Sequence, residues 1–214
     1  MKETIMVICA HSDDQIFGCG GSIIKYANEG NDIYTVIFSY GESSHPLMER
    51  KYAVETRVKE SRRVDKFIKG KGVTFLGLYE KSMARQIKEK GIEERLKKLI
   101  SQKKPDFIFT HSPSDPHPAH QICFRTVLKT VNSMNFRGNM YSFDIWNPIK
   151  IRGRRNPRLV VDITSTFHKK LKALQLFKSQ RIAYITLFPL IFFSAVANGL
   201  AHDMRYAEVF LKIK

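Results

Sequence analysis

The sequence has few cysteines, and they form no pattern. Among its 214 residues there are three, Cys9, Cys19 and Cys123, with no CxxC pair. An odd, scattered set argues against a disulfide framework and favours a reducing compartment. The first residues, MKETIMVICAHSDD, contain too short an apolar run for a signal peptide. We therefore expect a cytoplasmic protein.

Acidic residues are also scarce. Asp and Glu number 20 against 36 Lys and Arg, which gives a formal net charge of +16. Such a charge favours an anionic partner, although a solvated, lysine-rich surface explains it equally well. Net charge is the one feature that supports nucleic-acid binding, because the sequence lacks an RNP motif, zinc-finger spacing and a basic zipper region. We therefore do not expect a nucleic-acid partner.

One long stretch is almost free of charge. The residues IAYITLFPLIFFSAVANGLA, which follow the basic KSQR, are numerous enough to cross a membrane. A proline, a serine, an asparagine and a glycine interrupt them. We expect a buried helix or a contact in a homo-oligomer. Peripheral contact of Ile182–Phe193 with the inner face of a membrane is the second interpretation, and a true membrane span is the third.

Apolar runs rich in β-formers alternate with segments of helical period. Strands are expected at Ile5–Ala10, Ile33–Ser39, Val73–Leu78, Phe107–Thr110, Met140–Ile145, Leu159–Ile163 and Ala207–Ile213. One helix is expected at Ser22–Asn28, after a glycine cluster. There is no internal repeat. The alternation predicts an α/β fold, a Rossmann-like, mostly parallel sheet with helices on both faces, in a single domain over residues 1–214.

The glycine cluster GCGG does not fit a dinucleotide site. The Rossmann fingerprint follows its strand directly, whereas seven residues intervene here. The next strand, within TVIFSYGE, ends without an acidic residue. We therefore discount NAD and expect the glycines to let the start of a helix pass close to the loop before it.

Two apolar strands run directly into loops rich in His and Asp. The first is VICAHSDDQ and the second is FIFTHSPSDPHPAHQ. In open α/β sheets, ligands bind beyond the carboxyl ends of the strands. If these two strands are neighbours, their loops meet at one edge of the sheet.

The residues of these loops suit a catalytic metal site. Such a zinc site has three protein ligands and one open position. His11 and Asp14, three apart on a tight turn, can reach one ion, and His120 supplies a third ligand. Asp13, whose side chain points away from its neighbour's, suits a general base. His117 can face the same cavity and stabilise an oxyanion as a protonated imidazole.

Three nearby residues have secondary interpretations. His111 and Asp115 are candidates for orienting the ligands. Cys9 is soft enough to bind zinc, but within a strand it is more simply a small buried residue. Each short motif is common by chance, and an interior histidine is more often a core residue than a ligand. Their combination at two strand ends carries the prediction.

At this point the sequence resembles a known family, the LmbE-like (PIG-L-type) zinc-dependent N-acetylglucosaminyl deacetylases. The family's AHPDD motif stands here as AHSDD, its TxGE as SYGE, its RxxE as RVKE and its HPDH as HPAH. The later blocks YSFDIWNP, KALQLFKSQ and RYAEVF are also similar. The resemblance therefore spans essentially the whole chain.

The resemblance implies a role for each matching residue. His11, Asp14 and His120 match the ligands of one Zn²⁺ ion per chain, Asp13 matches the general base, and His117 matches the residue that stabilises the tetrahedral intermediate. The matching N and O ligands also suit other divalent transition metals.

Arg57 of RVKE matches a substrate-facing arginine of the family. The alternative is an ordinary surface salt bridge with Glu55 or Glu60. Two departures from the motifs, Ser12 for proline and Ala119 for aspartate, remove neither a ligand nor the base. Asp115 is a candidate substitute for the missing aspartate.

The implied function is zinc-dependent hydrolysis of the N-acetyl group of an N-acetylglucosamine-type sugar. The substrate is expected to be a small-molecule or lipid-linked amino sugar, and an anionic one would suit the basic segment Lys150–Arg158. The alternatives are another metal-dependent amide or phosphoester hydrolase on the same site, or a basic protein that binds nucleic acid or a membrane surface.

Overall fold

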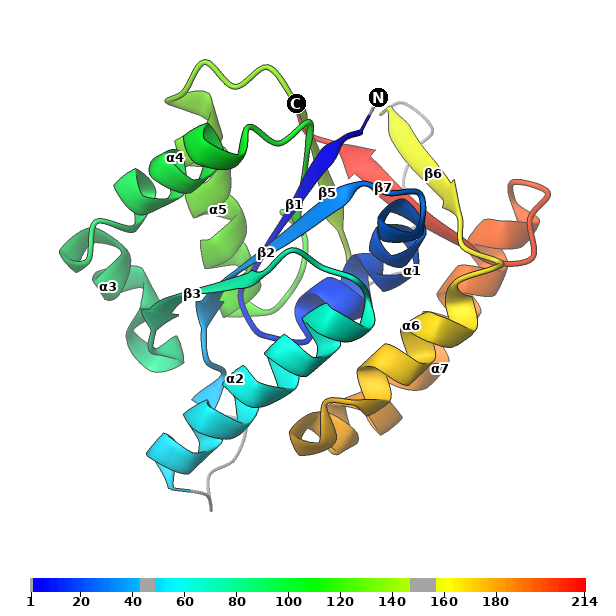
Figure 1. The fold of residues 1–214 in the computed structure, drawn as a ribbon, viewed down its shortest axis with the longest axis horizontal. Helices are drawn as coiled ribbons and strands as arrows, with labels where there is room; N and C mark the ends of the chain where they lie inside the picture. Colours follow the sequence, from blue (N-terminus) through cyan, green and yellow to red (C-terminus); the bar gives the residue numbers. More distant parts are fainter. Residues whose placement is uncertain (1, 43–48, 147–156) are drawn as a thin grey trace.

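A seven-stranded sheet forms the centre of the molecule (Figure 1). The computed structural model describes residues 2–42, 49–146 and 157–214. The sheet order is β3-β2-β1-β4-β5-β7-β6. The strands are β1 (Thr4–Cys9), β2 (Asp32–Ser39), β3 (Val73–Leu78), β4 (Phe107–His111), β5 (Asn139–Phe143), β6 (Arg158–Asp162) and β7 (Ala207–Lys212). Strands β1 to β5 are parallel, and β7 runs antiparallel to β5 and β6. The predicted α/β class and mostly parallel sheet are confirmed.

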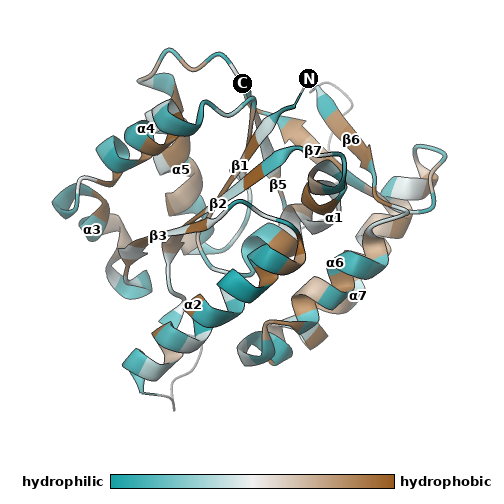
Figure 2. Cartoon of the chain, in the orientation of Figure 1, coloured by the Kyte–Doolittle hydropathy of each residue, from teal (hydrophilic) through white to brown (hydrophobic). Residues whose placement is uncertain are grey.

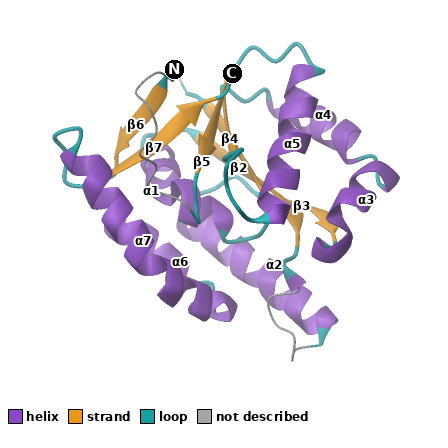
Figure 3. Ribbon diagram, turned by 180° about the vertical axis from the view of Figure 1, so that it is seen from behind, coloured by secondary structure: helices purple, strands orange, loops and turns teal. Residues whose placement is uncertain are grey.

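Helices cover both faces of this sheet (Figures 1 and 3). They are α1 (Asp14–Asn28), α2 (Arg50–Phe67), α3 (Met83–Glu89), α4 (Ile92–Lys103), α5 (Pro118–Asn132), α6 (Phe167–Gln175) and α7 (Arg181–Leu200), with 3₁₀ turns η2 (Glu80–Ser82) and η3 (Lys178–Gln180). Helices α1, α2, α6 and α7 lie on one face, and α3, α4 and α5 on the other.

The central strand β1 shows why two cores form. Successive side chains of a strand point to opposite faces. Ile5 and Val7 accordingly join the core beneath α1 and α6, whereas Met6 and Ile8 join the core beneath α4 and α5. All four are buried, as expected for a parallel strand covered on both faces.

Helix α1 begins at Asp14, eight residues before the expected Ser22. The glycines therefore lie inside the helix rather than before it. A Cβ atom on Gly18 would lie 2.1 Å from Cδ2 of Phe143, and one on Gly21 would lie 2.8 Å from Cβ of Ile163. The glycines allow close packing of this helix on neighbouring elements, which outweighs their low helix propensity.

The same helix is broken in its middle. At Cys19 the backbone leaves helical geometry, with φ −137° and ψ 21°. The carboxylate of Glu208, on β7, accepts hydrogen bonds from the backbone N–H of Gly21 (3.0 Å) and of the next residue (2.8 Å). The ammonium of Lys170, on α6, lies 2.7 Å from Glu208 and donates to the carbonyl of Phe17 at 2.9 Å. A buried ion pair thus satisfies the backbone groups that the break exposes.

Helix α7 differs from the expected buried helix. Four residues of α7 pack inward, Leu187, Ile191, Ala195 and Gly199. In the most apolar 18-residue stretch of this segment, however, only 17% of the residues are buried. By length and composition alone, the segment Lys178–Leu200 is long and apolar enough to cross a membrane. The expectation of a fully buried helix is therefore wrong, because the opposite face is exposed.

The basic segment Lys150–Arg158 lies mostly outside the described residues. Of Lys150–Arg158, the structure describes Pro157 and Arg158 alone. A role of this segment in binding an anionic substrate stays a prediction.

Candidate metal centre

The two polar loops meet at one edge of the sheet. Strands β1 and β4 pair in parallel, with Val7 opposite Phe109, so both end on the same side. The ring centroids of His11 and His120 lie 5.4 Å apart. Cys9, the last residue of β1, is buried, and its thiol donates to the carbonyl of His11 at 3.2 Å. It is the small buried residue expected.

Three residues of these loops, His11, Asp14 and His120, each offer a ligand atom, and these atoms lie within 4.8 Å of one another. Nδ1 of His11 lies 3.3 Å from Oδ2 of Asp14, and Nε2 of His120 lies 3.4 Å from Oδ1 of Asp14. Charge-assisted hydrogen bonds are shorter, at about 2.7–2.9 Å. Zinc–nitrogen and zinc–oxygen bonds of about 2.0–2.1 Å in a tetrahedral site place neighbouring donors about 3.4 Å apart. Two imidazoles and one carboxylate, all buried, are the donor set that zinc takes in catalytic sites. The residues therefore fit a divalent ion.

Hydrogen bonds orient the carboxylate and one imidazole of this group. Oδ2 of Asp14 accepts the backbone N–H of His11 at 2.7 Å, which leaves Oδ1 toward His120. Oδ1 of Asp115 lies 3.0 Å from Nδ1 of His120 and accepts the N–H of His117 at 3.0 Å. This is a carboxylate–histidine arrangement that holds the hydrogen on Nδ1 and turns Nε2 toward the ion. Asp115 thus occupies the orienting position expected of it.

His111 ties the two strands together at the edge of the site. Its Nε2 accepts the backbone N–H of Ala10 at 3.0 Å, and its ring stacks on that of His120 with centroids 3.9 Å apart. Burial and the charge of His120 lower the pKa of His111 to about 4. His111 is therefore a neutral acceptor that positions the ligand-bearing loops.

In the absence of a metal ion, the imidazoles of His11 and His120 are protonated at neutral pH. Burial alone would lower the pKa of His11, but the carboxylates of Asp14 and Glu80 outweigh it and raise the pKa to about 10. Burial likewise opposes a charge on His120, yet Asp14 and Asp115 raise its pKa to about 9. Burial would raise the pKa of Asp14, but the neighbouring imidazoles hold it well below its ordinary value. An arriving cation must displace these protons.

Arg57 makes a buried ion pair with Asp13 and none of the expected surface bridges. Its Nη2 lies 3.2 Å from Oδ1 of Asp13, and the residue is 1% exposed. Within the described residues, neither Glu55 nor Glu60 pairs with it. Glu60 instead accepts the backbone N–H and the hydroxyl of Ser179, at 2.9 and 2.5 Å. The surface-bridge interpretation is wrong because both residues of RVKE are used in long-range contacts.

All six candidate residues line one cavity of about 280 Å³. Its polar wall comprises His11, Asp13, Asp14, Arg57, His117 and His120, together with Glu80 and Gln180. Its apolar wall comprises Phe17, Ile145, Trp146, Ala183 and Leu187. The cavity therefore joins the strand-end loops to the start of α7.

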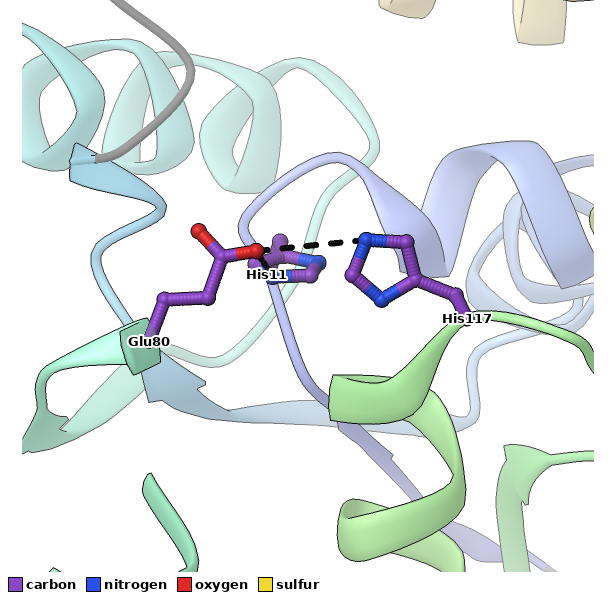
Figure 4. Close-up of side chains that lie close together, drawn as sticks. All are labelled: His11, Glu80 and His117. Atoms are coloured by element: carbon purple, nitrogen blue, oxygen red, sulfur yellow. Dashed lines mark ion pairs between the residues drawn. The ribbon is translucent and has the colours of Figure 1, made fainter. Parts of the chain in front are cut away.

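Glu80 is a site residue that the sequence analysis missed. Its Oε1 lies 3.4 Å from Nε2 of His11 and 3.9 Å from Nε2 of His117 (Figure 4). Glu80 follows β3, so a search for polar residues just after every predicted strand would have found it. A lone glutamate, however, carries no motif.

His117 caps helix α5. Its Nδ1 accepts the N–H of Ala119 at 3.3 Å, and Pro118 stands at the first helical position. Burial and the charges of His120 and His11 lower the pKa of His117. These surroundings favour a neutral ring with its hydrogen on Nε2, rather than the expected protonated imidazole.

Comparisons of the sequence with known proteins identify one family and several relatives. The sequence model of one family, described as "PIG-L: GlcNAc-PI de-N-acetylase", matches residues 6–131. A 4-oxalmesaconate hydratase of Pseudomonas putida is 26% identical over 197 residues, which cover 84% of this chain and 74% of that one. A probable N-acetyl-alpha-D-glucosaminyl L-malate deacetylase of Bacillus cereus is 23% identical over 194 residues, which cover 86% and 87%.

Solved structures show the same fold. The N,N'-diacetylchitobiose deacetylase of Pyrococcus horikoshii has a TM-score of 0.82 at 20% identity, covering 99% of this chain and 84% of that one. The 4-carboxy-2-hydroxymuconate hydratase of Pseudomonas putida has a TM-score of 0.81 at 20% identity, covering 100% and 97%. The predicted family is confirmed, and with it the expectation of a metal-dependent, hydrolytic N-deacetylase. The chain belongs to the PIG-L (LmbE-like) family of de-N-acetylases.

Proposed function

We propose that this chain hydrolyses the acetamide of an N-acetylglucosamine-type sugar, with Zn²⁺ held by His11, Asp14 and His120. The observation that carries the proposal is the spacing of 3.3 and 3.4 Å between the donor atoms of this triad, next to a buried Asp13–Arg57 pair. Membership of a de-N-acetylase family supports the reaction class. The products are acetate and a free amino sugar.

Asp13 is the proposed general base. A divalent ion in this site supplies Lewis acidity, which polarises the acetyl carbonyl and makes water acidic enough to attack near neutral pH. Oδ1 of Asp13 is held by Arg57, so we assign Oδ2 to the removal of a proton from the attacking water. Arg57 fixes this carboxylate and is itself one of the residues that line the cavity.

His117 is the proposed oxyanion donor. Its Nδ1 is occupied by the N–H of Ala119, which places the ring hydrogen on Nε2. Nε2 can therefore donate to the carbonyl oxygen as charge develops there. Asp13 or His117 then returns a proton to the departing amine.

The location of the reaction and the form of the substrate are part of the same proposal. The three cysteines are free and buried, as suits a reducing cytoplasm. The polar wall of the cavity suits a sugar, and its apolar wall leaves room for an attached group. A small-molecule or lipid-linked amino sugar is therefore the proposed substrate class.

A second reaction has specific support. The hydratase relative is 26% identical to this chain, against 23% for the deacetylase relative. The same base and metal site could direct water to a carbon–carbon double bond of an unsaturated acid. A hydratase would consume such an acid and release no acetate.

Acetate release tests the proposal. The metal-loaded protein is incubated with a panel of N-acetylglucosaminides and, separately, with an unsaturated dicarboxylic acid. We expect acetate from at least one sugar, loss of activity on chelation, and recovery with zinc. Asp13→Asn should lower turnover by about 10²–10⁴-fold while elemental analysis still finds the metal. Hydration of the acid without acetate release from any sugar would refute the deacetylase assignment.

A further inference from the structure

Helix α7 has a continuous apolar stripe on its exposed face. The large exposed side chains of this stripe are Ile182 (82% exposed), Ile185 (61%), Phe193 (61%) and Leu200 (74%). With about 100° of rotation per residue, these four positions fall within an arc of about 80°. The buried residues Leu187, Ile191, Ala195 and Gly199 lie on the opposite side of the helix.

This stripe is not the pattern of a helix on a soluble surface. Such a helix has an apolar face toward the core and a charged face toward water. After Arg181, α7 has no charged residue as far as Leu200, and Figure 2 shows pale to brown ribbon along it. Both faces of α7 are therefore apolar, and the described residues cover one of them.

The charges around α7 indicate what covers the other face. No acidic residue occurs between Asp162 and Asp203. Lys172, in the last turn of α6, and Lys178 and Arg181, just before and at the start of α7, are exposed. A groove of about 580 Å³ between α6 and α7 is lined by Lys178 and Arg181 together with apolar residues. This combination of basic groups beside exposed apolar side chains suits lipids with anionic head groups.

The inner face of α7, opposite the stripe, borders the candidate active site. Ala183 and Leu187, on the first turns of α7, line the metal-site cavity together with Trp146. A surface bound along the outer face of α7 would therefore be separated from this cavity by the width of one helix, about 10 Å.

We propose that α7 docks the protein on an anionic membrane surface, with the apolar stripe inserted at the interface and Lys178 and Arg181 on lipid phosphates. The basic residues beside the stripe favour an anionic lipid surface over a second copy of the chain, which is the alternative that the test below distinguishes. A membrane span is disfavoured because the inner face of α7 packs against the protein. The docking does not depend on the proposed reaction. If both hold, the substrate is a lipid-linked sugar.

Vesicle binding tests this proposal with the full chain. The protein is mixed with vesicles of phosphatidylcholine alone or of phosphatidylcholine with phosphatidylglycerol, and bound protein is separated by flotation. Trp146 is the one tryptophan in the sequence and lines the cavity, so its fluorescence reports on binding independently. We expect binding to the anionic vesicles that weakens as salt is added.

Substitutions separate the stripe from general charge effects. Phe193→Glu should weaken vesicle binding by at least about tenfold, since it removes one large apolar group from the interface. The matched control is Tyr52→Glu on α2, which makes the same change of charge at a residue of equal exposure, 60% against 61%. Lys178→Glu with Arg181→Glu should abolish the preference for anionic lipid.

Three outcomes would overturn the proposal. They are absence of binding to either vesicle, equal losses for Phe193→Glu and Tyr52→Glu, and a stable dimer in lipid-free solution that Phe193→Glu dissociates. Acetate release from a short-chain soluble substrate is measured in parallel. Activity there that Phe193→Glu leaves unchanged keeps the test of docking separate from the test of the reaction.

Discussion

Nη2 of Arg57 lies 3.2 Å from Oδ1 of Asp13, and both residues are nearly inaccessible to solvent. The pair joins α2 to the loop that carries the candidate ligands. Removal of one partner from a buried ion pair leaves an uncompensated charge. The proposed general base is therefore held in place by a residue 44 positions away in the sequence.

Arg57→Met should lower the free energy of unfolding by about 3–5 kcal/mol, because Asp13 is left buried and unpaired. Urea denaturation measures this loss. The control, Arg62→Met at an exposed position of the same helix, should change stability by no more than about 0.5 kcal/mol. Adding Asp13→Asn to Arg57→Met should recover part of the loss. Equal stabilities of Arg57→Met and Arg62→Met would contradict the pairing.

The metal-free protein should lose stability as pH rises. The folded-state pKa values of His11, about 10, and His120, about 9, lie above the ordinary 6.5. Their contribution is fully present below pH 6.5 and is lost as pH rises through 9 and 10. Thermal denaturation in the presence of a chelator, from pH 6 to pH 10, measures it. His120→Gln should flatten the slope, and a flat profile for the unsubstituted protein would refute the assignment.

Asp115→Asn should weaken metal binding by about 10–100-fold, because it removes the carboxylate that holds the hydrogen on Nδ1 of His120. The asparagine oxygen can still accept from the N–H of His117 and from Nδ1 of His120, which both face Oδ1, so the loop should keep its shape and only the negative charge is lost. Competition with a metal indicator dye measures the affinity. Asp203→Asn, at an exposed residue far along the sequence, is the matched control. An affinity that both variants leave intact would argue against the orienting role.

Glu208→Gln should destabilise the fold by about 3–5 kcal/mol, since Lys170 loses its buried partner. The exposed pair Lys129–Glu93, with the same 2.7 Å separation, is the comparison. Glu93→Gln should lower the free energy of unfolding by no more than about 1 kcal/mol. Thermal denaturation distinguishes the two, and similar shifts would mean that the Lys170–Glu208 pair between α6 and β7 is not effectively buried.

The strands were predictable because each is a short apolar run of β-formers with a clear end. The expected Ile5–Ala10, for example, is observed at Thr4–Cys9. The order of the strands was not predictable in detail. The insertion of β7 between β5 and β6 depends on pairing between distant segments, which no local pattern encodes.

Part of the candidate site was likewise predictable from the sequence, and part was not. His11 and Asp14 follow β1, and His120 lies in the segment after β4. Their proximity could therefore be predicted on the assumption that β1 and β4 are neighbours, which they are. The partner of Arg57 and the position of Glu80 required the tertiary structure, because each contact joins residues from separate helices or loops. The sequence was also misleading about the start of α1, which was expected at Ser22, after the glycines, but lies at Asp14.

The break in α1 has a consequence for any shortened form of this protein. The family match ends at residue 131, and every candidate ligand precedes that point. The side chains that bind the two halves of α1, however, belong to residues 170 and 208. A fragment that stops at the family boundary would retain a complete set of donor atoms but not the anchors of the helix that begins at one of them. Its failure to bind metal would therefore reveal nothing about the donors themselves.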